Sequence, residues 1–156
     1  MKVHSLLTND MVIPELNSTT RDAVLKEMGE FLKKRNKISK DKLLYEKLSQ
    51  REELGSTAIG DGVAIPHCKM QGVKNPVVML AISKKGVDFN ALDGKPSYIF
   101  FLVVSSPENP SVNLQILAAI AHLVRKAKRV ITKIQDAGDI EQILDVIRDE
   151  EERIDE

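Results

Sequence analysis

The stretch YIFFLVV, from Tyr98 to Val104, decides the fold class of this 156-residue chain. Every position in it is apolar or aromatic, whereas a strand with one face in water alternates apolar and polar residues, so the run indicates a strand covered on both faces. Two further apolar runs, VVMLAI at 77–82 and VAI at 63–65, precede it. Turn signals at Lys84–Gly86 and Asp93–Gly94 bound these runs, and we predict three strands of one sheet.

Apolar residues recur at helical spacing before this central region. The segment Ser18–Leu32 opens with Ser and Thr, which are good capping residues, and continues with apolar residues at helical intervals. A second helix is predicted to begin at Ser39 or Lys40 and to end before Gly55. Two helices are therefore expected to precede the strands.

Helical patterns return after the strands. Asn109 and Pro110 match an N-cap followed by proline at the first helical position. One face of the helix that follows is expected to be apolar and to consist of Leu114, Leu117, Ala118, Ala121 and Val124. Two shorter helices are predicted at about 127–135 and 139–148, on either side of Gly138.

The order of helices, strands and helices predicts an α/β protein, a single domain with a mixed β-sheet flanked by helices. A chain of this length buries enough surface to fold without a disulfide or a metal. The domain is expected to span residues 1–148. The acidic tail, 149–156, is expected to fray, as chain ends commonly do.

Composition argues against several functional classes. The 23 basic and 23 acidic residues cancel, which gives no electrostatic reason to expect nucleic acid or an anionic membrane as partner. No run approaches the roughly 20 apolar residues of a membrane helix, and the N-terminus lacks the apolar core of a signal peptide, so a cytoplasmic protein without membrane insertion is expected. Cys68 is the only cysteine, and with three scattered histidines it offers no metal-site spacing, so no metal or cofactor is expected.

The three histidines differ in context. His4 lies in a polar N-terminal stretch and is predicted to be a solvated surface residue, and His122 lies on a partly exposed helix face. His67 directly follows Pro66 at the end of an apolar strand, where proline interrupts regular pairing because it has no N–H. An imidazole held there can act as a nucleophile near neutral pH. The alternative is a histidine in a turn that donates to a carbonyl group.

The run REELGSTAIGDGVAIPH, from Arg51 to His67, closely resembles the signature of type-2 enzyme IIA domains. These are the fructose, mannitol and nitrogen-regulatory IIA proteins of the bacterial phosphoenolpyruvate-dependent phosphotransferase system. The resemblance implies a mixed sheet flanked by helices and a phosphotransferase component that carries phosphohistidine. It implies that His67 receives a phosphoryl group from the phosphohistidine of the phosphocarrier protein HPr, or of its nitrogen-branch paralogue. In sugar transport, the group then passes to a cysteine of a IIB domain.

Within this motif, several residues are candidates for phosphoryl binding. Arg51 is always cationic and offers a bidentate fork, although a cation at a helix C-terminus is favourable in itself. Ser56 and Thr57 offer hydroxyl groups, with turn capping as the alternative role. Gly55 permits close approach of the backbone, and Cys68 is expected to be a small apolar filler.

One position departs from the family pattern. Family members commonly carry a second histidine some 46 positions after the first, and Asn113 stands there in this chain. It is expected in the first turn of a helix, where backbone N–H groups and the dipole favour an anion. An amide can donate a hydrogen bond to a phosphoryl oxygen but cannot carry charge. We therefore expect His67 to be phosphorylated, with an altered transfer rate or phosphohistidine lifetime.

Two other functions remain open. The first is a degenerate or stand-alone regulatory module of the nitrogen type, whose phosphorylation state decides whether it binds a kinase, a transporter or a transcription regulator. The second is a small hydrolase that uses His67 as a base, but the chain has no convincing arrangement of a Ser or Cys nucleophile for it.

Overall fold

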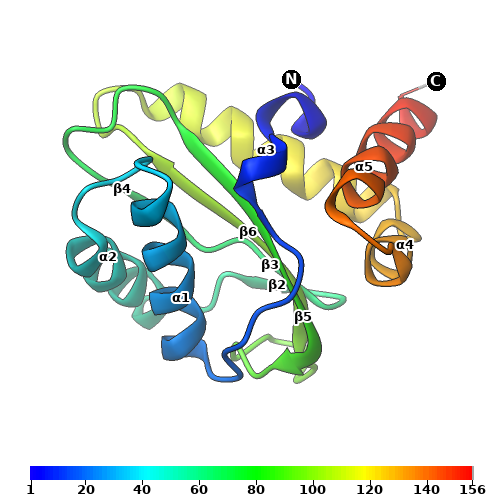
Figure 1. Ribbon diagram of the computed structural model, residues 1–156, viewed down its shortest axis with the longest axis horizontal. Helices are drawn as coiled ribbons and strands as arrows, with labels where there is room; N and C mark the ends of the chain where they lie inside the picture. Colours follow the sequence, from blue (N-terminus) through cyan, green and yellow to red (C-terminus); the bar gives the residue numbers. More distant parts are fainter. Residues whose placement is uncertain (156) are drawn as a thin grey trace.

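The computed structural model describes residues 1–155 and centres on strand β6 (Ser97–Ser105), which runs through the middle of a mixed sheet (Figure 1). The other strands are β1 (Val12–Ile13), β2 (Ala58–Gly60), β3 (Val63–Ala64), β4 (His67–Lys69) and β5 (Val77–Val87). β6 pairs antiparallel with β5 on one side and parallel with β3 and β4 on the other. β1 extends the sheet beyond β5, and β2 extends it beyond β3.

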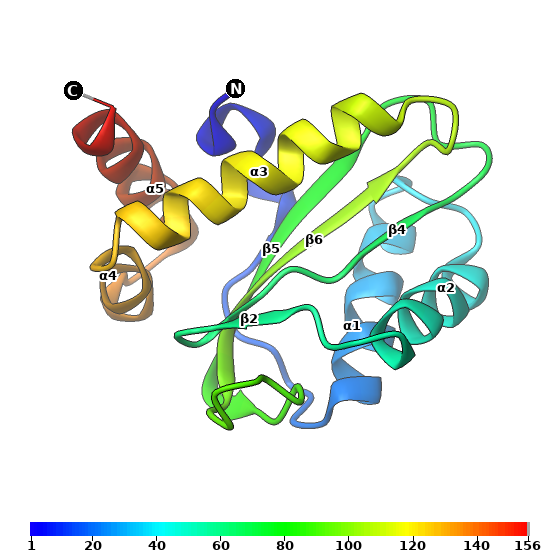
Figure 2. The ribbon, with the colours of Figure 1, turned by 180° about the vertical axis from the view of Figure 1, so that it is seen from behind.

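Helices cover both faces of this sheet. They are two short 3₁₀ helices, η1 (Val3–Leu6) and η2 (Asn9–Met11), and the α-helices α1 (Arg21–Lys34), α2 (Asp41–Glu53), α3 (Pro110–Lys126), α4 (Val130–Asp136) and α5 (Ile140–Ile154). One face is covered by α1 and α2, and the other by α3, α4 and α5 (Figures 1 and 2). The predicted α/β fold, a mixed sheet flanked by helices in a single domain, is confirmed.

The burial of β6 follows from its apolar sequence. Its residues alternate between two hydrophobic clusters, and all of them except Tyr98 are buried. Ile99, Phe101 and Val103 enter the cluster beneath α3, while Phe100, Leu102 and Val104 enter the cluster beneath α1 and α2. A strand sandwiched in this way has no polar face, as the uninterrupted apolar run predicts.

Local signals place the helix starts where the sequence predicts them. The Thr20 hydroxyl oxygen accepts a hydrogen bond from the Ala23 backbone N–H (3.3 Å) at the start of α1. Asn109 precedes α3, and Pro110 is its first residue. Asp139 caps α5 by accepting from the Gln142 backbone N–H at 2.8 Å. Each cap satisfies or replaces an N–H that a helix N-terminus leaves without a partner.

The buried face of α3 differs from the prediction. The helix packs on the sheet through Ile116, Ile120, Leu123 and Val124, whereas Leu114 is 65% exposed and Leu117 is only partly buried. The isoleucines and Leu123 recur at intervals of four and three residues and form a stripe of their own. A helix with apolar residues on two sides does not reveal from its sequence which side meets the sheet.

The predicted turn at Lys84–Gly86 lies instead inside β5. The strand pairs with β6 through Ile82, loses register, and pairs again at Val87. The Gly86 backbone N–H donates to the Ser83 hydroxyl oxygen (3.0 Å), and Gly86 has a φ of 86°. A bulge with a positive-φ glycine uses the same residues as a turn, which is why the sequence signal is ambiguous.

The acidic C-terminal segment also differs from the prediction, because α5 continues as a helix to Ile154 and only Glu156 lies outside the described residues. Glu150 and Glu151 are buried. Glu150 forms ion pairs with Lys133 and Arg153, both at 2.7 Å. Buried carboxylates with hydrogen-bonded partners anchor a helix end that would fray in isolation.

His4 is partly exposed, with 30% of its side chain accessible, but it is also bound to α5. Its Nδ1 lies 2.7 Å from a Glu151 carboxylate oxygen. The same carboxylate accepts the backbone N–H groups of Val3 (2.6 Å) and His4 (2.8 Å), so it caps η1 from α5. The N-terminal segment is thus attached to the last helix through a buried side chain that lies more than 140 positions away.

We expect Glu151→Ala to lower the free energy of unfolding by about 2 kcal/mol, because it leaves two backbone N–H groups without their acceptor. Urea denaturation monitored by circular dichroism measures the change. Glu152→Ala is the matched control, since Glu152 is exposed one position further along the same helix. Equal losses of stability in the two variants would contradict the capping role of Glu151.

Candidate functional site

The pairing of the polypeptide with β6 is interrupted at Ile65 and Pro66 and then resumes. β3 pairs with β6 at Ala64, and β4 resumes the parallel pairing at His67 in the register that β3 began. Between them, the Pro66 carbonyl accepts from the Val103 backbone N–H at 3.0 Å. The proline predicted that the strand ends at Pro66, and this prediction is wrong. The strand is interrupted there, and His67 is the first residue of the resumed strand.

One ring nitrogen of His67 is held by the backbone. Nδ1 lies 2.7 Å from the Ile65 carbonyl oxygen. Because a carbonyl oxygen can only accept a hydrogen bond, Nδ1 carries the proton in the neutral ring. The lone pair is then on Nε2, and the contact fixes both the tautomer and the orientation of the imidazole. The sequence left open that His67 donates to a carbonyl group. His67 does so through Nδ1, and this hydrogen bond leaves the lone pair on the other nitrogen, Nε2.

The surroundings of His67 favour the neutral ring. Partial burial is the main cause that lowers the pKa of His67 below its ordinary value of 6.5, and the charge of Arg51 lowers it further. The hydrogen bond to Ile65 and the charge of Glu52 act in the opposite direction. A neutral imidazole keeps the Nε2 lone pair that a nucleophile needs.

We expect the chemical shifts of the His67 ring to titrate with an inflection below pH 6.5, in a nuclear magnetic resonance titration of the whole protein. Phosphoryl acceptance should stay constant above that inflection and fall as the pH decreases through it, because protonation removes the lone pair. Arg51→Gln should raise the inflection, and Glu52→Gln should lower it, since each removes the charge that acts in the other direction. An inflection above pH 6.5 in the wild type would contradict this description.

His67 opens into a shallow depression of about 730 Å³. Residues from the end of α2, from β4 and from the first turns of α3 line it: Lys47, Gln50, Arg51, Glu53, Leu54, His67, Cys68, Lys69, Asn113, Leu114 and Leu117. Leu54 is 85% exposed and Leu114 is 65% exposed, so exposed apolar side chains line the depression together with an imidazole and several cations. We call these two exposed leucines the apolar rim. Its Leu114 comes from the side of α3 that does not pack on the sheet.

Arg51 is positioned by the loop that follows its own helix. One guanidinium nitrogen donates to the Gly55 carbonyl oxygen at 2.8 Å. Gly55 has a φ of 148°, and an added Cβ would meet no atom within 4 Å. Glycine is therefore required at position 55 by the backbone conformation and not by close packing. Arg51 lines the same depression as His67.

The hydroxyl groups of the loop are already engaged. Thr57 donates its hydroxyl (2.6 Å) and its backbone N–H (3.0 Å) to the buried carboxylate of Glu52. The Ser56 hydroxyl donates to the Phe89 carbonyl and accepts from the Ala58 backbone N–H at 3.0 Å. These contacts are the capping role that the sequence left as an alternative. Glu52, which the sequence analysis did not single out, is the residue that holds the loop to α2.

Asn113 lies in the depression with His67, at the fourth residue of α3. Its side chain is 6% exposed, and its carboxamide oxygen has no hydrogen-bond partner among residues 1–155. A buried polar atom without a partner is costly, so such atoms commonly mark functional positions. The sequence placed this residue correctly in the first turns of the helix.

The family of this chain follows from its similarity to known proteins. Residues 5–150 match the family described as "Phosphoenolpyruvate-dependent sugar phosphotransferase system, EIIA 2". The chain belongs to this family. EIIA domains of the family are phosphotransferase components that carry phosphohistidine.

Individual relatives come from both branches of the family. The chain is 31% identical over 147 residues to the fructose-specific EIIABC component of Bacillus subtilis, covering 94% of this chain and 23% of that protein. The nitrogen regulatory protein IIA-Ntr from Neisseria meningitidis is 25% identical, with a TM-score of 0.84, 93% of this chain and 98% of that chain being covered. IIA mannitol of Escherichia coli, solved in complex with phosphorylated IIB mannitol, has the same fold at 16% identity, with a TM-score of 0.74 and coverage of 92% and 97%.

Cys68 in this EIIA protein does not present a reactive thiolate. Burial raises the pKa of the Cys68 thiol to about 12, against a small opposing effect of Lys47. The thiol therefore stays protonated at neutral pH and fills space beneath the depression, as the sequence analysis expected. Among residues 1–155, no helix combines the length and apolar character required to cross a bilayer.

Proposed function

We propose that Nε2 of His67 accepts a phosphoryl group from the phosphohistidine of HPr, or of its nitrogen-branch paralogue. The observation that carries this proposal is the hydrogen bond from Nδ1 to the Ile65 carbonyl, which leaves Nε2 with the lone pair. In the transfer, the P–N bond of the donor breaks as the Nε2–P bond forms. His67 keeps its proton on Nδ1 throughout, so no separate base is needed.

Cations around His67 support the same role. Phosphoryl transfer depends mainly on positioning and on stabilising the charge of three oxygens. Arg51, Lys47 and Lys69 line the depression and supply positive charge. Gly55, Ser56 and Thr57 act in this proposal by shaping the loop that positions Arg51, and Asn113 donates an amide N–H to a phosphoryl oxygen.

The next acceptor is a cysteine of a IIB domain, where the Nε2–P bond breaks as a P–S bond forms with the thiolate. The IIA mannitol relative was solved with a phosphorylated IIB partner, which supports this assignment. The apolar rim of Leu54 and Leu114 provides a surface for transient docking of protein partners. Both partners act in the cytoplasm, where we place this protein.

The second candidate is a regulatory role of the nitrogen type. It is favoured by the higher structural similarity to IIA-Ntr than to IIA mannitol. In this case the phosphorylated depression, with about two added negative charges, changes affinity for a regulatory protein. Both candidates require the same phosphorylated His67 and differ only in the downstream partner.

The test is to incubate the protein with phosphoenolpyruvate, enzyme I and HPr, and in parallel with the nitrogen-branch paralogues, and to measure the intact mass. We expect a gain of one phosphoryl group that acid removes and alkali does not. Nitrogen-15 spectra of the product should assign the P–N bond to Nε2. No gain of mass with either set of donors would refute the carrier function.

We expect Asn113→His to change the phosphohistidine lifetime by roughly three- to tenfold, because a charge-capable ring replaces a neutral amide next to the phosphoryl group. The measurement is the loss of phosphoryl mass with time after the donors have been removed. Asn113→Gln is the control, since it keeps the amide. A lifetime equal to the wild type in both variants would show that this position does not touch the phosphoryl group.

A further inference from the structure

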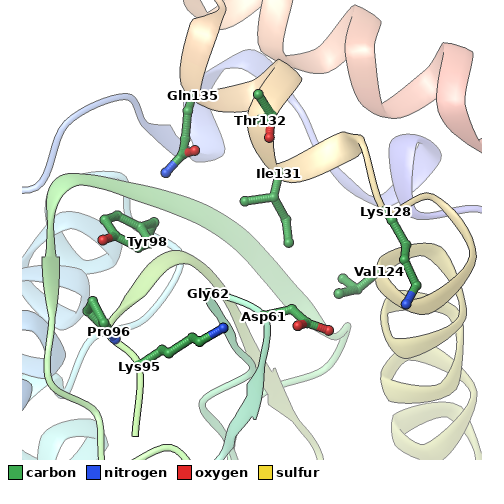
Figure 3. Close-up of a pocket in the computed structure, with 10 residues that line it drawn as sticks. All are labelled: Asp61, Gly62, Lys95, Pro96, Tyr98, Val124, Lys128, Ile131, Thr132 and Gln135. Carbon is green, nitrogen blue, oxygen red and sulfur yellow. The ribbon is translucent and has the colours of Figure 1, made fainter. Parts of the chain in front are cut away.

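A second depression lies at the opposite end of β6 from His67 (Figure 3). It encloses about 630 Å³, within the range of small-molecule sites. His67 pairs with Val103, whereas Tyr98 near the start of β6 lines this second depression. Five residues of strand separate the two, which corresponds to about 17 Å. The second depression is therefore distinct from the phosphoryl site.

Four separate segments form its walls. Asp61 and Gly62 come from the turn between β2 and β3, and Lys95 and Pro96 from the loop that precedes β6. The end of α3, the α3–α4 connection and α4 contribute Val124, Lys128, Ile131, Thr132 and Gln135. Figure 3 shows the α4 side chains on one side of the depression, facing Asp61 and Lys95 on the other.

Two glycines leave room for the Tyr98 ring, one in the β2–β3 turn and one in β5. A Cβ at Gly62 would lie 3.3 Å from this ring, and a Cβ at Gly86 would lie 2.8 Å from it. Both glycines have positive φ, so neither position readily accepts another residue. Tyr98 is also the single residue of β6 that is not buried. The ring thus lies between two side-chain-free positions and stays partly open to the depression.

Asp93 connects two of the walls. Its carboxylate accepts the backbone N–H of Asp61 at 3.1 Å and the backbone N–H of Lys95 at 3.0 Å. These hydrogen bonds hold the β2–β3 turn to the loop before β6 and pre-form the depression. A pre-formed site loses less entropy when a ligand binds.

The two lysines of the depression form no direct ion pair among the described residues, although the Asp93 carboxylate lies near Lys95. Across residues 1–155, the ammonium groups of Lys95 and Lys128 form neither a hydrogen bond nor an ion pair within 4 Å. Asp61 is the only acidic residue of the lining, so the lining carries a net positive charge. Two lysines from different segments suit a ligand group with two negative charges.

We propose that this depression binds a small organic phosphate monoester. The ammonium groups of Lys95 and Lys128 would both bind the phosphate, on the open side of the Asp61 carboxylate that Figure 3 shows between them. Its organic body would lie against the Tyr98 ring and Ile131, where an apolar surface is open. The Thr132 hydroxyl and the Gln135 amide on α4 provide hydrogen bonds to polar substituents of that body.

The test uses the full chain with the substitution His67→Ala, which removes the phosphoryl acceptor from the other site. Glucose 6-phosphate and adenosine 5′-monophosphate are the probes, because they share the phosphate and differ in the body. Glucose, inorganic phosphate and succinate are the controls. Proton–nitrogen correlation spectra locate each compound and give its Kd.

We expect at least one monoester to shift the amide signals of Gly62, Lys95 and Lys128, with a Kd at least about tenfold below that of inorganic phosphate, since the body adds contacts. The double variant Lys95→Gln/Lys128→Gln should raise the Kd by about tenfold or more. Lys34→Gln/Lys42→Gln is the matched control, because these exposed lysines lie on the opposite face of the sheet.

Three results would overturn the proposal. The first is the absence of shifts with both monoesters. The second is a set of shifts centred on Lys47, Lys69 and Asn113, which would place the anion at the phosphoryl site. The third is equal affinity for succinate, or an equal loss of affinity in the control double variant, since either would indicate unspecific attraction of anions. A failure here leaves the carrier function of His67 untouched, because that function is tested by transfer from HPr.

Discussion

His67→Ala is expected to abolish phosphorylation of the protein by HPr and enzyme I. The variant should gain no phosphoryl mass under conditions that fully convert the wild type, a loss of more than about a thousandfold in rate. No other histidine lines the depression. The Cys68 thiol stays protonated because burial raises its pKa to about 12, and lysine and arginine side chains lack a lone pair at neutral pH.

His122→Ala is the control for this experiment. His122 is exposed on α3 outside the depression, so its removal should leave the phosphoryl gain unchanged. His67→Ala should also retain binding to HPr, because the apolar rim that we assign to docking is intact. A residual phosphoryl gain in His67→Ala, or its loss in His122→Ala, would move the acceptor away from position 67.

The sequence was sufficient for the central elements of the fold because their signals are local. An apolar run such as Tyr98–Val104 has few structures available to it other than a strand covered on both faces. Thr20 likewise identifies a helix start through its hydrogen bond with Ala23, and Pro110 does so through its missing N–H, although the Asn109 side chain makes no capping hydrogen bond. The position of His67 at a strand beside a proline followed from the same kind of local reasoning.

The differences arise where a long-range contact decides the outcome. Glu151 is buried because it accepts N–H groups of Val3 and His4, at the other end of the chain. β4 resumes after Pro66 because β6 offers a partner in the same register. The residues next to Glu151 and to Pro66 do not indicate these contacts. Their local sequence predicts only an acidic tail and the end of a strand.

The same distinction applies to the site. The sequence identified Arg51, His67 and Asn113, and the structure brings all three into one depression. It could not decide whether Ser56 and Thr57 face a ligand or the protein, because a hydroxyl group serves either purpose. Their hydrogen bonds to Phe89 and Glu52 are contacts within the protein.

The backbone next to Pro66 determines which ring nitrogen of His67 keeps its lone pair. The pairing with β6 is interrupted between Ala64 and His67, and the Ile65 carbonyl oxygen accepts a hydrogen bond from His67 Nδ1. In the function that we propose, the Ile65 carbonyl therefore selects Nε2 as the reacting nitrogen, while the cations around it stabilise the transferred charge.

Arg51→Ala is accordingly expected to reduce the rate of phosphoryl transfer to His67 by about a hundredfold, the usual cost of removing one group that stabilises transition-state charge. Arg51→Lys should lose about tenfold, because it keeps the charge but not the planar fork. Single-turnover rates at saturating phospho-HPr measure the chemical step, and the concentration dependence reports docking. The concentration for half-maximal rate should stay within about twofold of the wild type, since the apolar rim is unchanged.

A purely structural role for Arg51 predicts a different pattern. Its contact with the Gly55 carbonyl is the link that such a role would use, and losing it would loosen the loop in both variants alike. Alanine and lysine would then lower the rate equally, and thermal unfolding would shift to lower temperature in parallel. Arg125→Ala, an exposed arginine on α3 away from the depression, controls for the loss of one positive charge. A graded loss, with lysine between wild type and alanine at unchanged stability, is the result that our assignment of Arg51 to the phosphoryl group requires.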